Sequence, residues 1–463
     1  MLSFIALCVI LAVGHLFRMK IRFLRQLYLP SCVIGGLLAL AIIQGMKGCY
    51  ALWPNEWLAH LNDSFALWSQ PWAKLPGFLI NIVFACLFLG IRLPGISQLW
   101  HRAKFQVAYG QIVAWGQYVV GIGLWLILLQ WFYPDLPDMF AGILPVGFEG
   151  GHGTAAGLGP VFQQYGWAEG KDFALTSATF GILGAITIGM VLINWAARSG
   201  YTVRKTNPDD IEEDDSISVI PVDRRPIAGR LTVNSDAIES FSLHIAIVGL
   251  ACLIGYLIKQ SLLVMESGIP CLSEMGLFKG FPLFPLCMLG GLIIQICEER
   301  FDRHNLIDVG LTRRIQNSAL DFLVVAAIAT INLNVVMKGI VPLIILVVAG
   351  VLWNVGCLTL LARRILPDAW FERAIAEMGQ SMGVTATGLL LLRVVDPDYE
   401  SSAADAFACK QLIHEPIMGG GLWTGAAIPL IATIGALPVF AISVGAVSIW
   451  LAIVFLPRLL RRT

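Results

Sequence analysis

The segment Phe148-Glu149-Gly150-Gly151-His152-Gly153-Thr154-Ala155-Ala156-Gly157 lies between two apolar runs and decides how this chain folds. Four glycines fall within eight positions, and each costs about 1 kcal/mol in a helix interior relative to alanine. Unpaired backbone groups cannot face hydrocarbon, so a broken segment at membrane depth must be buried in protein or line a cavity. We expect a re-entrant hairpin at residues 139–166. The alternative is a glycine-rich loop that only lets helices pack closely.

The same pattern returns in the second half of the chain. Residues 149–157 align with residues 380–388, and Thr-Ala-x-Gly superposes on Thr-Ala-x-Gly. Paired glycine-interrupted segments at matching positions of two apolar halves are the best sequence indication of a transporter's binding site. We therefore expect a second re-entrant hairpin at residues 372–393.

The composition is that of an integral membrane protein. Of 463 residues, 57% are hydrophobic and 13% are charged, and the mean hydropathy is +0.76. Soluble domains carry about 25% charged residues. Nucleic-acid-binding modules, P-loops and dinucleotide fingerprints are absent from the sequence. Ten cysteines include no CxxC pair, and only Cys49 and Cys271 fall in expected loops, where they could form a disulfide.

The apolar runs predict an all-α membrane protein built from two inverted-topology repeats. Each repeat has about five transmembrane helices and one hairpin, and one extra helix follows at the C-terminus. The first repeat covers residues 1–197, a charged cytoplasmic linker covers 198–240, and the second repeat covers 241–463. Residues 47–74 are expected to form an interfacial loop or surface helix. Spans are expected at 2–17, 28–46, 75–93, 105–133, 173–197, 241–265, 281–298, 318–337, 340–362, 404–434 and 437–457.

The basic residues set the expected orientation. With re-entrant hairpins, 24 lysines and arginines fall on the cytoplasmic side and six lysines fall outside, with Lys410 left inside a helix. This follows the positive-inside rule, whereas a first hairpin that crossed the membrane would send the basic loops outward. We expect a multi-pass protein with its N-terminus outside and its C-terminus in the cytoplasm.

Two regions of the chain resemble the bacterial sodium/glutamate symporters. The family's Gly-Gly-His-Gly-Thr run matches residues 150–154, and its Gly-x-Thr-x-Thr pattern matches Gly383, Thr385 and Thr387. A following Pro-x-x-Gly matches Pro416 and Gly419. The resemblance implies an inverted-repeat secondary transporter of the bacterial inner membrane, a homodimer that moves glutamate or a related carboxylate with sodium. No cofactor besides the coupling ion and no nucleic-acid partner is expected.

The chain departs from the family at five ionisable positions beside the expected site, and its tail is longer by one helix. The positions are Glu149, Glu377, Lys410, His414 and Glu415. Ionisable residues within a membrane are costly and are functional candidates, so Glu377, Lys410, His414 and Glu415 are candidates for proton coupling. Lys410 and His414 are four apart and share a helix face, whereas Glu415 points about 100° away. Glu377 could instead neutralise Lys410 as a structural ion pair.

The two hairpins offer unwound backbone and hydroxyl groups. Helix N-termini attract carboxylates, and carbonyls and hydroxyls suit a hard cation such as Na⁺. Sodium contacts are expected from Asn332, Thr385 and Thr387, with both threonines on one face if their segment is extended. His152 could contact substrate or hold the hairpin by a hydrogen bond. Substrate contacts are expected from Gly150, Gly151, His152, Gly153, Thr154, Ser381 and Gly383.

Three other functions fit parts of the pattern. A sodium- or proton-coupled carrier of another organic anion, such as a hydroxycarboxylate, would use similar hairpins. A membrane-embedded metal-dependent enzyme would use Glu149, His152, His414 and Glu415, but Gly150-Gly151 breaks the helix that would present the first two together. A channel fits less well, because discontinuous segments that open to opposite sides suit alternating access.

Overall fold

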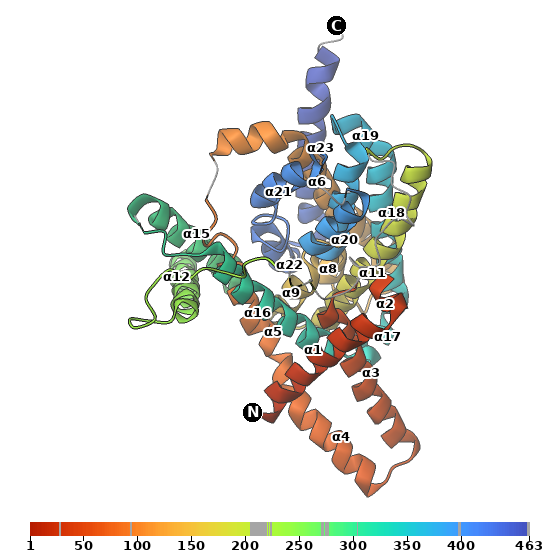
Figure 1. Cartoon of the computed structure of the whole chain (residues 1–463). Coiled ribbons are helices and arrows are strands. Elements are labelled where there is room, and N and C mark those ends of the chain that lie inside the picture. The colour runs from red at the N-terminus through yellow and green to blue at the C-terminus, as the bar shows by residue number, and fades with distance from the viewer. Residues whose placement is uncertain are drawn as a thin grey trace. The chain divides into compact units, whose positions relative to one another are not determined.

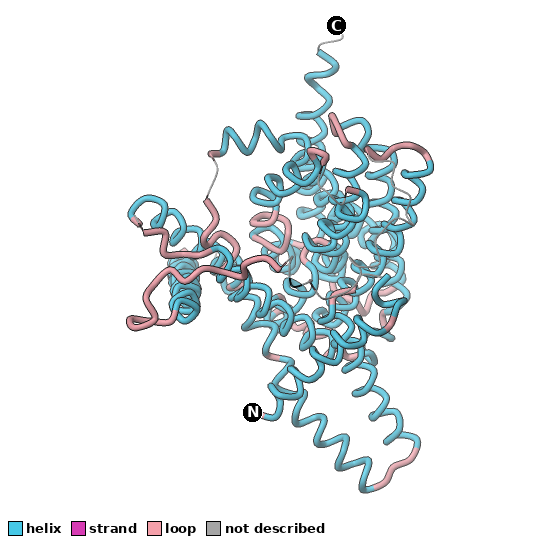
Figure 2. The backbone as a smooth tube through the Cα atoms, viewed as in Figure 1, coloured by secondary structure: helices cyan, strands magenta, loops and turns pink. Residues whose placement is uncertain are grey.

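The computed structural model is almost entirely helical. Helices hold 81% of the residues, and no strand occurs in the part of the chain that the structure describes (Figure 2). Inside a membrane, a helix pairs every backbone N–H and C=O group within its own segment, which accounts for this uniform choice. The described residues are 1–26, 29–92, 95–203, 220, 222, 225–269, 273, 277–302, 304–396 and 400–460.

Eight helices of the described chain are long and apolar enough to cross a membrane. The multi-pass membrane protein that the composition predicted is thereby confirmed. Two shorter apolar helices cover Asp138–Phe148 and Leu422–Ile434. The eight candidate spans are Leu2–Lys20, Ser31–Leu52, Ala103–Phe132, Gly170–Arg198, Ser240–Gly268, Ile340–Ile365, Trp370–Val395 and Ala436–Leu456.

The chain forms two compact units, and each combines segments from both halves of the sequence. Unit 1 comprises residues 1–93, 156–160 and 213–332, and unit 2 comprises residues 94–155, 161–212 and 333–463. The units therefore do not coincide with the two expected repeats, whose internal symmetry stays a prediction.

Unit 1 contains the N-terminal helices and the first helices of the second half (Figure 1). Backbones cross closely here: a Cβ atom on Gly290 of α15 would lie 2.1 Å from the carbonyl oxygen of Ala251 on α12. Small residues at such crossings let membrane helices pack without a hydrophobic driving force. The helices are α1 (Leu2–Lys20), α2 (Arg22–Gln26), α3 (Ser31–Leu52), α4 (Glu56–Ser69), α5 (Leu75–Ala85), α12 (Ser240–Gly268), α14 (Leu277–Gly280), α15 (Phe284–Phe301) and α16 (Val309–Ala329).

Unit 2 contains most of the first glycine-rich segment, all of the second, and the C-terminal helices. Two short helices, α9 (Gly151–Gly157) and α10 (Gly159–Gln164), include residues of both units. The other helices of unit 2 are α6 (Ile96–Leu124), α7 (Gln130–Phe132), α8 (Ile143–Phe148), α11 (Gly170–Arg198), α17 (Leu333–Lys338), α18 (Ile340–Gly356), α19 (Ala362–Ile365), α20 (Trp370–Val395), α21 (Ala403–His414), α22 (Leu422–Ile434) and α23 (Ala436–Leu460).

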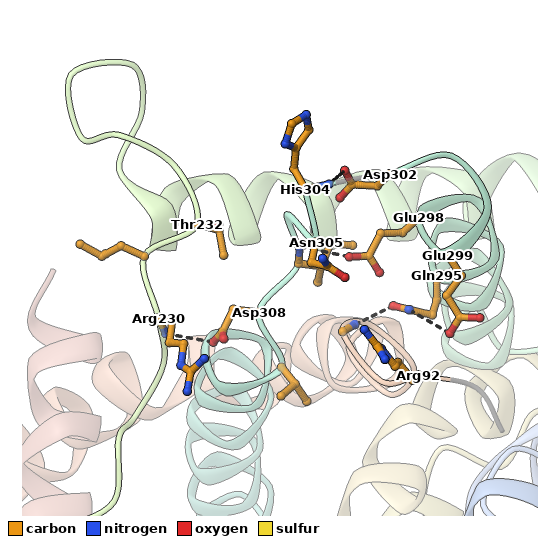
Figure 3. Close-up of a pocket in the computed structure, with 14 residues that line it drawn as sticks. Arg92, Arg230, Thr232, Gln295, Glu298, Glu299, Asp302, His304, Asn305 and Asp308 are labelled. Atoms are coloured by element: carbon orange, nitrogen blue, oxygen red, sulfur yellow. Dashed lines mark hydrogen bonds between the residues drawn. The ribbon is translucent and has the colours of Figure 1, made fainter.

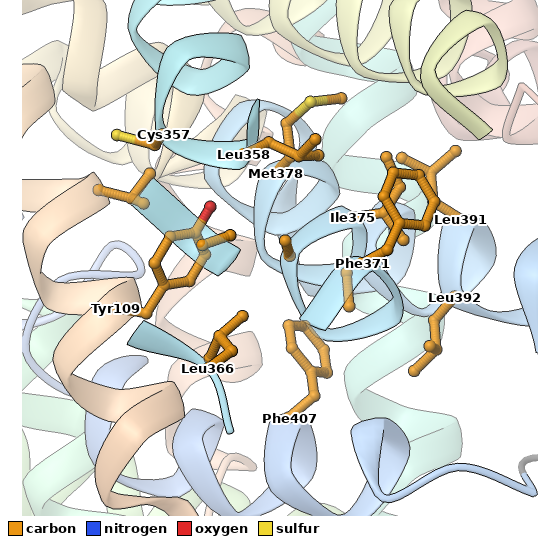
Figure 4. Close-up of a cluster of buried hydrophobic side chains, with 14 of the residues drawn as sticks. Tyr109, Cys357, Leu358, Leu366, Phe371, Ile375, Met378, Leu391, Leu392 and Phe407 are labelled. Atoms are coloured by element: carbon orange, nitrogen blue, oxygen red, sulfur yellow. The ribbon is translucent and has the colours of Figure 1, made fainter. Parts of the chain in front are cut away.

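The apolar core of unit 2 surrounds α20. Phe371 and Ile375 from the beginning of this helix share one buried cluster with Leu391 and Leu392 from its end, and Phe407 of α21 joins them (Figure 4). Residues 16 to 21 positions apart in one helix would be separated by about 24–32 Å if it were straight. Their common cluster indicates that α20 folds back on itself.

Several predicted boundaries need correction. The helix expected at 75–93 ends at Ala85. The long helix expected at 404–434 is two helices, because residues 415–421 contain Pro416 and three consecutive glycines. The helix expected at 318–337 begins at Val309, where Asp308 caps it by accepting from the Leu311 N–H at 2.9 Å. It ends at Ala329.

The expected linker at 198–240 lies between α11, which ends at Arg198, and α12, which begins at Ser240; residues 204–219 lie outside the described part of the chain. Its described C-terminal part is not free in solution: the Arg230 N–H donates to Asp308 Oδ1 at 3.2 Å. The expected disulfide partner Cys271 lies outside the described residues, and Cys49 is an exposed free thiol.

Candidate functional site

The first glycine-rich segment breaks its helix at Glu149 and Gly150. Helix α8 ends at Phe148, and the N–H groups of Glu149 and Gly150 both bond to the Pro145 carbonyl, at 3.0 and 3.2 Å. Gly151 then adopts φ +65°, a left-handed conformation that glycine alone adopts without strain. The break falls where the sequence predicted it.

The second glycine-rich segment breaks α20 at Gly383 and Val384. Val384 has φ 65° and ψ 170°, a conformation that costs a β-branched residue about 1–3 kcal/mol. A Cβ atom on Gly379 would lie 2.8 Å from the Cα of Gly388, although nine residues of straight helix would span about 13 Å. The two arms of α20 therefore pack side by side as a helical hairpin.

The two breaks meet inside unit 2. A Cβ atom on Gly151 would lie 2.4 Å from Cγ1 of Val384, and one on Gly181 of α11 would lie 2.2 Å from the Met382 carbonyl oxygen. Distorted backbone from both halves of the sequence is thus concentrated at one place, as the repeated motif led us to expect of a binding site.

A completely buried ion pair lies beside this meeting point. Lys410 Nζ is 2.6 Å from Glu377 Oε1, and both side chains are 0% exposed. The ammonium also donates to the side-chain oxygens of Gln380 and Gln411, each at 3.0 Å. Glu377 Oε2 accepts from Gln106 Nε2 at 3.0 Å. The neutralisation of Lys410 by Glu377 that the sequence suggested is confirmed, and every donor and acceptor of the pair has a partner.

A second buried acidic group, Glu149, is joined to this pair through Gln380. Gln380 Nε2 donates to Glu149 Oε2 at 2.7 Å, while its Oε1 accepts from Lys410. Glu149 and Gln380 are the residues that align in the two repeats. His414 Nε2 lies 3.4 Å from the same Glu149 oxygen. Within the described residues, Oε1 of Glu149 has no hydrogen-bonding partner.

The orientation of His414 follows from its neighbours on α6. Trp115 Nε1–H can only donate, and it donates to Gln111 Oε1 at 2.9 Å. The amide nitrogen of Gln111 must therefore face His414 Nδ1, 3.2 Å away, which makes Nδ1 an acceptor. The ring proton is left on Nε2, directed at Glu149.

Three aromatic rings pack together near Glu149. The ring centroids of Trp115 and Trp423 are 4.5 Å apart, and those of Tyr118 and Trp423 are 6.0 Å apart. Among the described side chains, the Tyr118 hydroxyl and the Trp423 indole nitrogen are buried without a hydrogen-bonding partner. Aromatic rings of this kind attract cationic groups as well as apolar ones.

His152 lies in the first hairpin and is directed at α11. Its Nε2 is 3.0 Å from the Thr179 hydroxyl, which itself donates to the Leu175 carbonyl. Because the single hydroxyl hydrogen is used in that way, His152 donates. This contact supports the role of holding the hairpin. Thr154, two residues further on, is buried, and no described group pairs with its hydroxyl.

The three predicted sodium ligands do not share one location: Thr385 and Thr387 lie on α20, and Asn332 belongs to unit 1. The non-helical backbone is confined to Gly383 and Val384, so Thr385 and Thr387 stand on helix and point about 200° apart; the expectation of an extended segment was wrong. Thr385 accepts from Gln411 Nε2, and Thr387 donates to the Gly383 carbonyl at 2.5 Å. Asn332 belongs to unit 1, where its side chain is exposed in the break after α16.

The remaining predicted residues lie at one of the two breaks or directly after α21. The Ser381 hydroxyl donates to Gln380 Oε1 at 3.4 Å, and its carbonyl accepts from Gln117 Nε2 at 2.6 Å. Gly150 and Gly153 are buried at the first break. Glu415 is half-buried at the residue after α21.

Sequence reasoning overlooked three glutamines on α6: Gln106, Gln111 and Gln117. All are buried, and each bonds to a residue on α20 or α21. The signal was present, because glutamines within an apolar span of residues 103–132 are costly unless they have partners.

Unit 1 contains a separate polar cavity of about 900 Å³, which none of the predicted site residues lines (Figure 3). One of its carboxylates, Asp302, already accepts hydrogen bonds from the backbone N–H groups of Leu306 and His304, both at 2.7 Å. These two N–H groups lower the pKa of Asp302.

Comparison with known proteins is consistent with this arrangement. The profile of the sodium/glutamate symporter family matches residues 1–399, so α21, α22 and α23 follow the matched region. No curated protein and no solved structure matches the chain. Since the match covers most of the sequence, this chain belongs to the sodium/glutamate symporter family, and it is a membrane transporter and not an enzyme.

Proposed function

We propose that this protein is a secondary transporter that moves glutamate, or a related carboxylate, together with sodium by alternating access. The observation that carries the proposal is the meeting of two helix breaks, at Gly151 and at Val384, in the interior of unit 2. Broken helices expose backbone dipoles without a covering side chain, and that is how membrane transporters bind a small anion and its coupling ion.

The substrate carboxylate would bind along the glycine-rich backbone of the two breaks. Gly150, Gly151 and Gly153 from the first break, and Gly383 from the second, have no side chain to obstruct its approach. The hydroxyls of Thr154 and Ser381 would add donors. The lack of a described partner for the buried Thr154 hydroxyl supports this assignment, since buried polar groups are ordinarily satisfied.

Sodium would bind at the second break. Thr387 and the Gly383 carbonyl form a compact pair of oxygens there, whereas Thr385 points about 200° away from Thr387 around the helix. Asn332, which belongs to unit 1, is not assigned to this site. Hard cations prefer several such oxygens.

Alternating access requires that the two hairpins open to opposite faces of the membrane. We propose that the hairpin at 139–166 enters from outside and the hairpin at 372–393 enters from the cytoplasm, in an inner-membrane homodimer of inverted repeats. The basic-residue distribution supports this orientation.

The test is uptake of radiolabelled glutamate by proteoliposomes with and without an inward sodium gradient at fixed pH. We expect accumulation that requires the gradient and that Gly383→Leu abolishes, because its side chain would meet Thr387, whose hydroxyl oxygen would lie 2.9 Å from the first added carbon. Malate in parallel separates a hydroxycarboxylate carrier from an amino-acid carrier. Sodium-independent glutamate uptake would contradict the proposed coupling.

A further inference from the structure

Four ionisable side chains meet in the interior of unit 2, and their charges do not cancel. Glu149, Glu377, Lys410 and His414 are each at most 1% exposed. Lys410 and Glu377 neutralise one another at 2.6 Å, and all of their polar atoms are used. Gly110 makes room for the pair, because a Cβ atom there would lie 2.4 Å from Cε of Lys410. This pair is complete without any further charge.

His414 does not supply the missing positive charge. Its Nδ1 accepts a hydrogen bond from Gln111, whose amide is held in that orientation by the Trp115 indole. A second ring proton, on Nδ1, would point at the amide N–H group of Gln111, so that two donors would face each other. The imidazole is thus kept neutral and presents one donor to Glu149.

Glu149 is left as an uncompensated buried carboxylate. Its Oε2 receives Gln380 Nε2 at 2.7 Å and faces His414 Nε2 at 3.4 Å, while the described chain provides nothing for Oε1. Further titratable groups on the adjoining elements include Tyr118 on α6, Glu377 on α20 and His152 on α9. His152 is engaged with Thr179. An ionised carboxylate without a counter-charge is costly at such a place.

We propose that Glu149 binds and releases one proton in each transport cycle, so that proton movement accompanies sodium-driven uptake. A proton from water on the open side of the membrane joins Oε1, which converts the carboxylate to a neutral carboxylic acid. It leaves to water on the other side after the transporter has reopened, and the carboxylate is restored. This inference rests on the proposed transport function.

The surroundings favour a proton over a metal ion. A metal cation needs several oxygen ligands, whereas two N–H donors approach the Oε2 side of Glu149. A proton needs one free oxygen, which Oε1 provides. Glu377 and Lys410, expected from the sequence as proton carriers, pair with each other at 2.6 Å, and their polar atoms all have partners. Of the four ionisable side chains, Glu149 is the one with a carboxylate oxygen that no described group pairs with, so we assign the role to it.

The test compares wild type with Glu149→Gln, which imitates the protonated acid, and with the matched control Glu169→Gln at an exposed position. Glutamate uptake is measured across a pH series at a fixed sodium gradient, with pH gradients imposed in either direction. Wild-type and Glu169→Gln uptake should fall up to about tenfold per pH unit once the pH exceeds the titration point of a single proton site. Uptake by Glu149→Gln should be independent of pH.

A second measurement does not depend on substrate. The pH-induced infrared difference spectrum should contain a buried carboxylic acid band that is present in wild type and in Glu169→Gln and absent from Glu149→Gln. If no variant takes up glutamate but this band behaves as stated, the proposed function fails and the proton site stands. The proton site is refuted if wild type lacks the band. It is also refuted if uptake by Glu149→Gln keeps the wild-type pH dependence. A Glu149→Gln variant that folds but is inactive at every pH refutes it as well, because the carboxylate would then be a ligand for sodium or for the substrate's ammonium group.

Discussion

Replacement of Gly151 by alanine tests the contact between the two helix breaks. Two costs add at this position. The left-handed φ of +65° costs a residue with a side chain about 1–2 kcal/mol. The new Cβ would also lie 2.4 Å from Val384 Cγ1, and overpacking of this kind costs about 1–3 kcal/mol. We expect Gly151→Ala to destabilise the protein by about 2–5 kcal/mol in total.

Gly166 provides the matched control for the backbone contribution. Its φ is +78°, yet a Cβ atom there would meet nothing within 4 Å, so Gly166→Ala should cost only the first contribution. Val384→Gly in the Gly151→Ala background should remove the steric contribution and show a coupling energy of about 1–3 kcal/mol. Thermal unfolding of the purified protein, followed by size-exclusion chromatography, measures all four variants beside wild type.

The reasoning would be refuted by either of two results. The first is a Gly151→Ala variant no more destabilised than Gly166→Ala, which would mean that the breaks do not touch. Strict additivity of Gly151→Ala and Val384→Gly would lead to the same conclusion. Uptake assays on the same samples show whether transport falls together with stability.

Three further predictions concern the buried ion pair, the sodium site and the orientation of the two hairpins. Lys410→Met should destabilise the protein by about 3–5 kcal/mol because it leaves the buried Glu377 without its partner. Adding Glu377→Gln should restore part of the lost stability, measured by thermal unfolding. An unchanged unfolding midpoint for Lys410→Met would contradict the buried pair. Thr387→Val should raise the sodium concentration required for half-maximal uptake. The control is Thr187→Val on the exposed face of α11, which also removes a hydroxyl bond to the carbonyl four residues earlier and should leave that concentration unchanged. If the two variants have equal effects, Thr387 is not part of the sodium site. Single cysteines at Ala168 and Glu400 in a cysteine-free background should react with an impermeant reagent from outside and from the cytoplasm, respectively, and labelling of both from one side would disprove the opposed hairpins.

The sequence by itself determined the class of the protein and the positions of its helix breaks. Low charge and long apolar runs leave a chain no alternative to membrane helices. Gly150-Gly151, and Gly383 next to the aligned Ser381-Met382, lie in or beside the two breaks because glycine is a poor helix former wherever it occurs. Their repetition also led us to predict that both breaks contribute to one site, and the breaks do meet inside unit 2. These are local properties of the chain, and local properties can be read from the order of residues.

Only the tertiary structure decided which side chains meet. Gln380 bonds to Glu149 across 231 positions, and Gln111 orients His414 across 303. No local pattern specifies such pairs, since the same glutamines could have faced other helices. The tertiary structure likewise placed Thr385 and Thr387 on helix, where the sequence had suggested an extended segment, and left Oε1 of Glu149 without a hydrogen-bonding partner among the described residues. Whether a buried polar group is satisfied depends on its neighbours in space, and those are known only once the helices have packed.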